Sequence, residues 1–232
     1  MILKEGKINI EKLINNVSNI KNSEKILKIS ESFLDIPYVS NTLIGSAEID
    51  EILTINFEGL DCMTLIEYVE ALRLSTDFES FIKNIKLVRY KNGIVGFKTR
   101  RHFFSDWGSL KTVKNVTYEI GKSLCHTEYK KLNRIDAKRR WIEGLPVKLR
   151  KIIYIPVKHL SEALRNLNSI YYCGFFSLKE GLDVEHVGIL FKKNNIPTLR
   201  HASLIKSKVV DEILLEYASN KNGIILYKPI FK

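Results

Sequence analysis

Cysteine is scarce in this chain: its 232 residues include three, at positions 62, 125 and 173. An odd number of widely spaced cysteines argues against a disulfide framework. The sequence has no CxxC pair, and its five histidines show no HExxH-like spacing. We therefore expect neither a structural zinc site nor another metal centre.

Glycine and proline are also few, with 12 and 5 residues, and no linker rich in these residues divides the chain. No apolar run approaches the ~18 residues of a membrane span. Hydrophobic residues make up 45% and charged residues 27%, as in ordinary globular proteins. The length fits one domain with a sizeable core, so we expect a single domain over residues 1–232.

The first residues, "MILKEGKINIEKLINN", contain no apolar core of the kind found in a secretory signal. This leaves two expectations for localisation. The protein acts in the cytoplasm or is delivered by a signal-independent route, or a removed signal once directed it to the periplasm or cell envelope.

Positive charge is concentrated in one part of the chain. The formal net charge is +11, and residues 122–158 carry eleven Lys or Arg against three Asp or Glu. Such a segment favours an anionic partner, for which nucleic acid, a membrane surface and an anionic cell-wall polymer are the candidates. It lacks regularly interleaved aromatics and a recognition-helix motif, so we expect no specific nucleic-acid reader. A solvated helical face is the alternative interpretation of this basic, partly helical insertion around 110–158.

Hydrophobic periodicity predicts helices first and strands later. Helices are expected over 9–20, after Ser23 and over 62–75, and Asn92-Gly93 between two β-rich runs predicts a hairpin. The basic segment 118–151 is expected to be helical and irregular. Strands are expected in "IYYCGFFSL", "HVGILFK" and "TLRHASL", then a helix in "VVDEILLEYASN" and a last strand in "GIILYKP". This order predicts an α+β protein with a mostly antiparallel sheet.

Cys62 stands out within "GLDCMTLIEYVEAL", because it follows Asp61 at the start of a predicted helix. The positive end of a helix favours the thiolate form, and the N–H groups there can hold an oxyanion. The alternative is a buried apolar cysteine, which is common.

A thiolate nucleophile needs a base, and the base needs a group that orients it. His186 begins "HVGILFK" and His201 lies in "TLRHASL". If these runs form a hairpin with an even-numbered loop, both rings lie on one face; an odd-numbered loop would separate them. Together with Cys62 they suggest a Cys-His-His site, while each histidine taken alone could be structural.

These residues carry a family resemblance. "LDCMTLIEYV", "EHVGILF" and "LRHAS" resemble the three blocks of the NlpC-type, papain-like cysteine peptidases. "PYVSNTL" (37–43), "YKNGIVGFKTRRHFFSDW" (90–107), "YIP" (154–156) and "GLDVEHVGI" (181–189) are similar to one branch, the N-acetylmuramoyl-L-alanine amidase-like family. The similarity spans roughly residues 33–230.

The resemblance implies a papain-like fold, with the cysteine on an N-terminal helix and both histidines on the sheet. It implies Cys62 as nucleophile, His186 as base and His201 as orienting residue, with no cofactor. Residues matched to the proposed substrate cleft are Tyr38, Arg100, His102, Asp106 and Trp107. Asp183, which is close in sequence to His186, is a further candidate for binding an amine. For Trp107 a core role, for Asp106 a turn cap, and for Asp183 a turn are the structural alternatives.

The implied function is amide hydrolysis in peptidoglycan, at the bond between N-acetylmuramic acid and L-alanine. Three alternatives stay open. The chain could cut within the stem peptide, act as a delivered effector on another amide or acyl substrate, or be a catalytically dead basic binding module. The expected partners are peptidoglycan or muropeptides, together with an anionic wall polymer on the basic segment.

Overall fold

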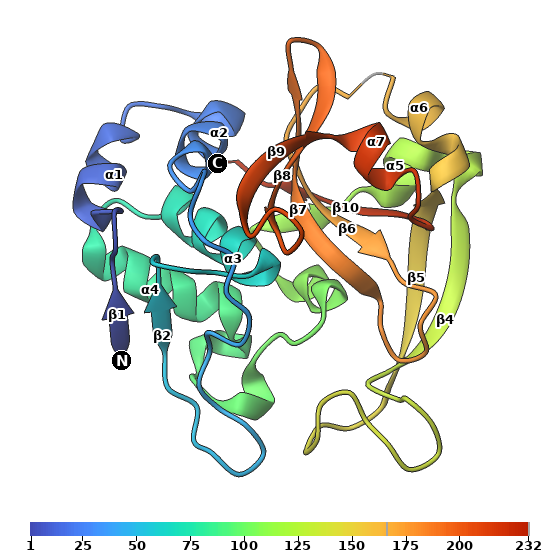
Figure 1. Ribbon diagram of the computed structural model, residues 1–232, viewed down its shortest axis with the longest axis horizontal. Helices are drawn as coiled ribbons and strands as arrows, with labels where there is room; N and C mark the ends of the chain where they lie inside the picture. Colours follow the sequence, from blue (N-terminus) through green and yellow to red (C-terminus); the bar gives the residue numbers. More distant parts are fainter. Residues whose placement is uncertain (166, 232) are drawn as a thin grey trace. The chain divides into compact units, whose positions relative to one another are not determined.

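The computed structural model describes residues 1–165 and 167–231 (Figure 1). The chain divides into two compact units. We call Met1–Arg101 with Arg200–Asp211 the helical unit, and His102–Leu199 with Glu212–Lys232 the strand unit.

The helical unit contains a two-stranded parallel sheet and four helices. The sheet pairs β1 (Ile2–Lys4) with β2 (Thr54–Asn56). The helices are α1 (Ile10–Asn16), α2 (Asn22–Glu31), α3 (Cys62–Arg73) and α4 (Phe78–Arg89). The helices predicted over 9–20 and 62–75 are thus present with shorter bounds. The helix predicted after Ser23 is also present, but it begins earlier, at Asn22, and its N-cap is Lys21. Arg200–Ser203 of β8 (Ile196–Ser203) and Lys208–Asp211 of β9 (Lys208–Ile213) complete the unit.

Helix α3 is buried on every side from Thr64 to Arg73, and the most exposed of these residues, Arg73, is only 9% accessible. Phe57 packs edge-on against Tyr68 of α3 and against Phe33, with ring centroids 4.8 and 5.4 Å away. Such aromatic pairs add to the stabilisation from burial. Only the first turn of α3 reaches the surface, and Cys62 lies there, half-buried.

The strand unit is built on a mostly antiparallel sheet with the order β4-β5-β10-β6-β7-β8, and β3 also pairs with β10. The strands are β3 (Val113–Asn115), β4 (His126–Leu132), β5 (Lys148–Pro156), β6 (Tyr171–Phe176), β7 (Val184–Lys193) and β10 (Gly223–Pro229). Short helices α5 (Thr117–Gly121), α6 (Leu160–Ala163) and α7 (Leu214–Ala218) complete the unit. The prediction of a mixed α+β protein with a mostly antiparallel sheet is confirmed.

The basic segment differs from its prediction. Figure 1 shows β4 and β5 side by side as one hairpin, joined by the loop 133–147. The helical expectation for 118–151 is wrong apart from α5 and the 3₁₀ turn Lys122–Leu124. Successive residues of β4 and β5 point alternately to the two faces of the hairpin. Because charged residues are frequent on both faces, the sequence shows no clear apolar–polar alternation there.

The hairpin predicted at Asn92-Gly93 is absent, and α4 occupies its first arm. Both residues do adopt positive φ, at 55° and 71°, as the dipeptide predicts. They form a 3₁₀ turn after the helix instead. The competing signal is the capping box of α4, in which Asp77 and Ser80 bind each other's backbone N–H groups at 2.7 and 3.0 Å.

The helix predicted in "VVDEILLEYASN" is half wrong, since its first part is β9 and only Leu214–Ala218 is helical. The predicted strands "IYYCGFFSL", "HVGILFK" and "GIILYKP" are present as β6, β7 and β10. Within the described residues, no helix combines the length and apolar character needed to cross a bilayer.

Candidate active site

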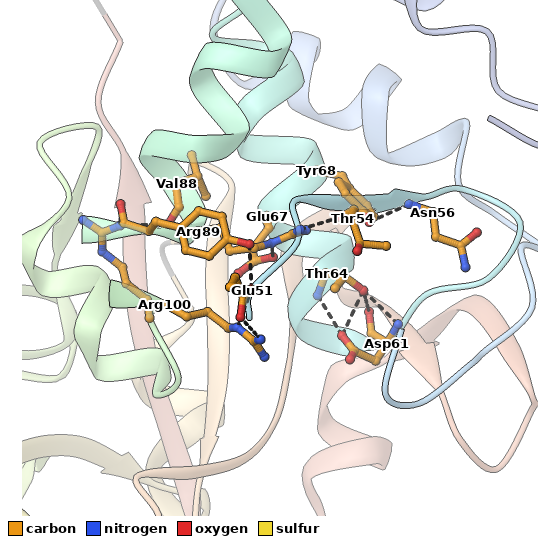
Figure 2. A network of polar contacts seen from close by, with 12 residues as sticks. Glu51, Thr54, Asn56, Asp61, Thr64, Glu67, Tyr68, Val88, Arg89 and Arg100 are labelled. Atoms are coloured by element: carbon orange, nitrogen blue, oxygen red, sulfur yellow. Dashed lines mark hydrogen bonds and ion pairs between the residues drawn. The ribbon is translucent and has the colours of Figure 1, made fainter. Parts of the chain in front are cut away.

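Cys62 is the first residue of α3, as predicted. Asp61 is its N-cap: the carboxylate accepts the backbone N–H of Thr64 at 2.8 Å, and the Thr64 hydroxyl accepts the N–H of Asp61 at 2.9 Å (Figure 2). This reciprocal capping box fixes the first turn. The thiol therefore lies at the positive end of a well-defined, buried helix.

Tyr38 lies next to this turn within the same unit. Its segment is pinned by backbone bonds, because the N–H of Val39 donates to Leu60 O at 3.0 Å and the N–H of Tyr38 donates to Ser207 O at 2.9 Å. Burial raises the pKa of the Tyr38 hydroxyl, and the charges of Cys62 and Asp61 raise it further. The side chain is half-buried, so an aromatic hydroxyl sits within electrostatic reach of the thiol.

His201 is buried on β8 and belongs to the helical unit. The preceding Arg200 holds this strand in place, since its guanidinium binds both carboxylate oxygens of Asp211 at 2.7 and 2.9 Å. It also donates to Ser30 Oγ at 2.9 Å and Leu27 O at 3.2 Å on α2. A two-pronged, buried arginine of this kind fixes geometry, and here it fixes the strand that carries His201.

His186 is half-buried on β7 in the strand unit. It pairs in register with Phe175 of β6, and its ring lies 5.7 Å from the Tyr217 ring and 6.3 Å from the Phe175 ring. Lys221 packs over Tyr217 and forms an ion pair with Glu185 at 2.8 Å. Two aromatic rings thus lie beside the imidazole.

The loop between β7 and β8 bears on the question of the two histidines. Strand β7 ends at Lys193 and β8 begins at Ile196, so two residues form the loop. Asn194 and Asn195 both have positive φ, at 49° and 64°, which is typical of a two-residue hairpin turn. The loop therefore has an even number of residues.

Arg100 is engaged within the helical unit. Its guanidinium forms a two-pronged ion pair with Glu51 and also donates to Gly45 O at 3.3 Å (Figure 2). Tyr90 donates its hydroxyl to the same Glu51 at 2.7 Å. Arg100 thus anchors the segment around Glu51, and its contact with substrate stays a prediction.

The predicted cleft residues of the strand unit are embedded in a polar network. Asp106 accepts from Arg150 at 2.9 Å and from the N–H of Phe103 at 3.3 Å, and Arg150 also donates to Ser105 Oγ at 2.9 Å. Buried Asp183 accepts the N–H of Ser105 at 2.6 Å, and burial raises its pKa despite that bond.

Trp107 is fully buried against Tyr172, with ring centroids 5.0 Å apart. These contacts agree with the structural alternatives for Asp106 and Trp107, namely a turn cap and a core residue. His102 is half-buried, and its substrate role stays a prediction.

The model of the N-acetylmuramoyl-L-alanine amidase-like family matches residues 28–224. The chain belongs to this family. The match covers Tyr38, Cys62 and both candidate histidines, as well as the 100–107 block.

Solved structures of similar proteins extend over nearly the whole chain. An N-acetylmuramoyl-L-alanine amidase from Bacteroides uniformis is 25% identical, with a TM-score of 0.76 over 90% of this chain and 98% of that one. A protein from Legionella pneumophila is 22% identical, with a TM-score of 0.76 over 95% of this chain and 93% of that one. The second likeness shows the fold alone. No curated protein matches the sequence.

Sequence reasoning about this amidase-like chain missed the charged partners that hold the candidate residues. Glu67 of α3 binds Arg89 at 2.7 Å, and Arg89 also donates to Thr54 O at 2.6 Å (Figure 2). Glu70 binds Arg73 at 2.6 and 2.7 Å. The sequence did contain one signal for these pairs. Helix α3 is apolar on all sides, so its acids have no solvent-facing side and need buried partners.

In the described part of the chain, no three His, Cys, Asp or Glu side chains gather closely enough to hold a metal ion. The candidate groups that the sequence predicted are the thiol, the imidazoles and the tyrosine hydroxyl of this chain. A thiol at a capped helix start, an imidazole base and an orienting imidazole can together perform acyl transfer.

Proposed function

We propose that this chain is a cysteine amidase of the NlpC-type, papain-like superfamily that hydrolyses the N-acetylmuramoyl-L-alanine bond of peptidoglycan. The family to which the chain belongs supports a peptidoglycan-type substrate. The observation that carries the cysteine mechanism is the position of Cys62, a half-buried thiol at the capped start of a buried helix.

In the proposed reaction, the Cys62 thiolate attacks the carbonyl carbon of the muramoyl amide. Backbone N–H groups of the first turn of α3 bind the oxyanion. The imidazolium of His186 gives its proton to the amine of L-alanine, which leaves as the C–N bond breaks. The product of this half-reaction is a thioester between Cys62 and the muramoyl group.

Water completes the proposed cycle. His186 takes a proton from water, and the hydroxide adds to the thioester carbonyl. The C–S bond then breaks, which releases a muramoyl carboxylate and restores the thiol. His201 orients His186 throughout, in the role of a third triad member. The even-length loop between β7 and β8 supports this assignment, because an odd-length loop would separate the two rings.

The proposal is tested by digesting purified peptidoglycan and identifying the products by mass. Free stem peptides that begin with L-alanine are expected. We expect Cys62→Ala to lower turnover by roughly 10³-fold or more, and His186→Ala to be almost as severe, because triad members act as a unit. His201→Ala should be milder, since nucleophile and base remain.

Cys125→Ala is the matched control, since that cysteine is half-buried in the strand unit and outside the proposed site. It should retain activity, and EDTA should change nothing. Products cleaved between residues of the stem peptide would show that the scissile bond lies there, and would favour a stem-peptide endopeptidase. Full activity in Cys62→Ala, or loss of activity on chelation, would overturn the mechanism.

A further inference from the structure

The β4–β5 hairpin presents a distinct outer face. The strand register places Tyr129 opposite Lys151 and Lys131 opposite Leu149. Directly opposed residues share a face, and residues two apart along a strand share it too. Four side chains therefore project from one side of the hairpin, and all four are exposed, Tyr129 at 65% and Leu149 at 69%.

Two cations of the opposite face, Lys130 and Arg150, contribute to the fold. Buried Lys130 donates to Ser177 O at 2.7 Å and to Lys179 O at 2.9 Å. Arg150, which is opposite Lys130 in the register, binds Asp106 and Ser105. Lys130 and Arg150 thus hold the structure, whereas Lys131 and Lys151 on the outer face point to solvent, as does Lys148 at the end of the hairpin.

The outer face carries a single sign of charge. Its positions 127, 129, 131, 149, 151 and 153 contain no Asp or Glu. Within residues 1–165 and 167–231, neither Lys131 nor Lys151 forms an ion pair with an acid. The two ammonium groups are therefore available to an anionic partner.

The hairpin is also held rigidly at its loop. The Asn133 side chain donates to Ile142 O and Leu145 O, both at 2.9 Å, and Trp141 Nε1 donates to Glu180 O at 2.8 Å. Gly181 packs so closely on Arg134 that a Cβ would lie 2.1 Å from its carbonyl oxygen, and its φ is +78°. A surface fixed in this way loses little conformational entropy on binding.

We propose that the outer face of the hairpin, formed by Tyr129, Lys131, Leu149 and Lys151, binds a phosphodiester-bearing anionic polymer of the bacterial wall. Lysine suits phosphate as a compact charge, and Tyr129 offers a flat ring to the sugar or polyol units. This inference rests on the peptidoglycan substrate of the proposed function. It adds a second contact with the wall, carried by the strand unit, whereas Cys62 belongs to the helical unit.

Two other anionic partners, single-stranded nucleic acid and a membrane surface, fit the face less well. Single-stranded nucleic acid is bound on successive aromatic side chains, whereas this face has one. A membrane surface requires a broad apolar face that inserts below the headgroups, whereas Leu149 and Tyr129 lie beside two lysines. Both anionic partners serve as comparison probes in the test.

The lysines of this hairpin also have a structural explanation, which the test must distinguish from polymer binding. Strand β4 is the outermost strand of its sheet, and lysines on edge strands discourage pairing with other chains. Glutamate would protect an edge equally well but would repel a polyanion. Charge reversal therefore distinguishes polymer binding from edge protection.

The experiment measures binding of the full-length Cys62→Ala protein to purified walls, so that digestion does not interfere. The probes are walls that retain their teichoic acid and the same walls stripped of it with hydrofluoric acid. We expect binding to the retained walls to weaken as the salt concentration rises from about 0.05 to 0.3 M, because the distance over which exposed charges interact falls with ionic strength.

In that background, Lys131→Glu/Lys151→Glu should weaken binding about tenfold, since each exposed charge contact contributes modestly. Tyr129→Ser should weaken it by a smaller factor at unchanged charge. The matched control, Lys12→Glu/Lys83→Glu, reverses two exposed lysines of the helical unit and should leave binding unchanged.

Three results would overturn the proposal: equal binding to stripped and retained walls, equal losses in the hairpin and control variants, or tighter binding to anionic phospholipid vesicles or single-stranded DNA than to retained walls. Because binding is measured without turnover, the outcome does not depend on whether Cys62 is the nucleophile. A failure of the amidase mechanism would appear in the product analysis instead.

Discussion

Helix α3 and the β4–β5 hairpin use charged side chains in opposite ways. In α3, Glu67, Glu70 and Arg73 are buried, and each acid is paired with an arginine at 2.6 to 2.7 Å. On the outer face of the hairpin, Lys131 and Lys151 are exposed and face no acid. A charge serves the fold where water is excluded and remains available to a partner where it is not.

The sharpest way to break this contrast is to remove one member of a buried pair. Arg89→Met leaves the carboxylate of Glu67 buried without its partner, which should lower the free energy of unfolding by about 3–5 kcal/mol. Glu67→Leu/Arg89→Met removes both charges and should recover much of that loss. Urea unfolding of the three proteins measures the difference, and a single variant within about 1 kcal/mol of wild type would contradict it.

A second comparison uses the cysteines that lie beside these two regions. Cys62 begins α3 and Cys125 precedes β4, and both are half-buried. Burial raises the pKa of the Cys125 thiol, which lowers its thiolate fraction at neutral pH, whereas a helix start favours thiolate at Cys62.

Iodoacetamide at pH 7 should therefore label Cys62 about tenfold faster than Cys125. Cys173 should be slower still, because complete burial raises its pKa and blocks access. Peptide mass mapping over time gives the three rates. Equal rates in the folded protein would count against Cys62 as nucleophile.

The smallest effect is expected at the hairpin. Lys131→Glu/Lys151→Glu changes the net charge by four units, yet exposed substitutions of this kind usually alter stability by no more than about 0.5 kcal/mol each. Urea unfolding should show a midpoint close to that of wild type. A loss as large as that of Arg89→Met would mean that the outer face supports the fold, and would remove the contrast with α3.

The sequence was sufficient where a pattern is local. The start of α3 at Cys62 follows from Asp61 and the apolar residues behind it, and β7 and β8 follow from their apolar runs. Asn92-Gly93 also adopted the positive φ values that its chemistry predicts. The conformation of these short segments is decided by nearby residues.

The sequence was insufficient where partners are distant. The sequence does not show which cation pairs with Glu67, because Arg89 lies 22 positions later in the chain. Asn92-Gly93 ended a helix rather than a hairpin because α4 buries Phe81 and Ile85 in the core. Tertiary packing overrode a local turn preference there. Adjacent strand residues such as Lys130 and Lys131 point to opposite faces, and only the distant Ser177 and Lys179 decide that Lys130 is the buried one.

The path of the chain through its two units has a further consequence. The helical unit is discontinuous, because the chain leaves it after Arg101 and returns only for Arg200–Asp211. That short segment contains His201 and also Arg200, whose guanidinium donates hydrogen bonds to α2. A gene fragment ending at Arg101 would encode α1 to α4 without that anchor. Neither unit can therefore be inherited, lost or exchanged as a module by a single break in the gene.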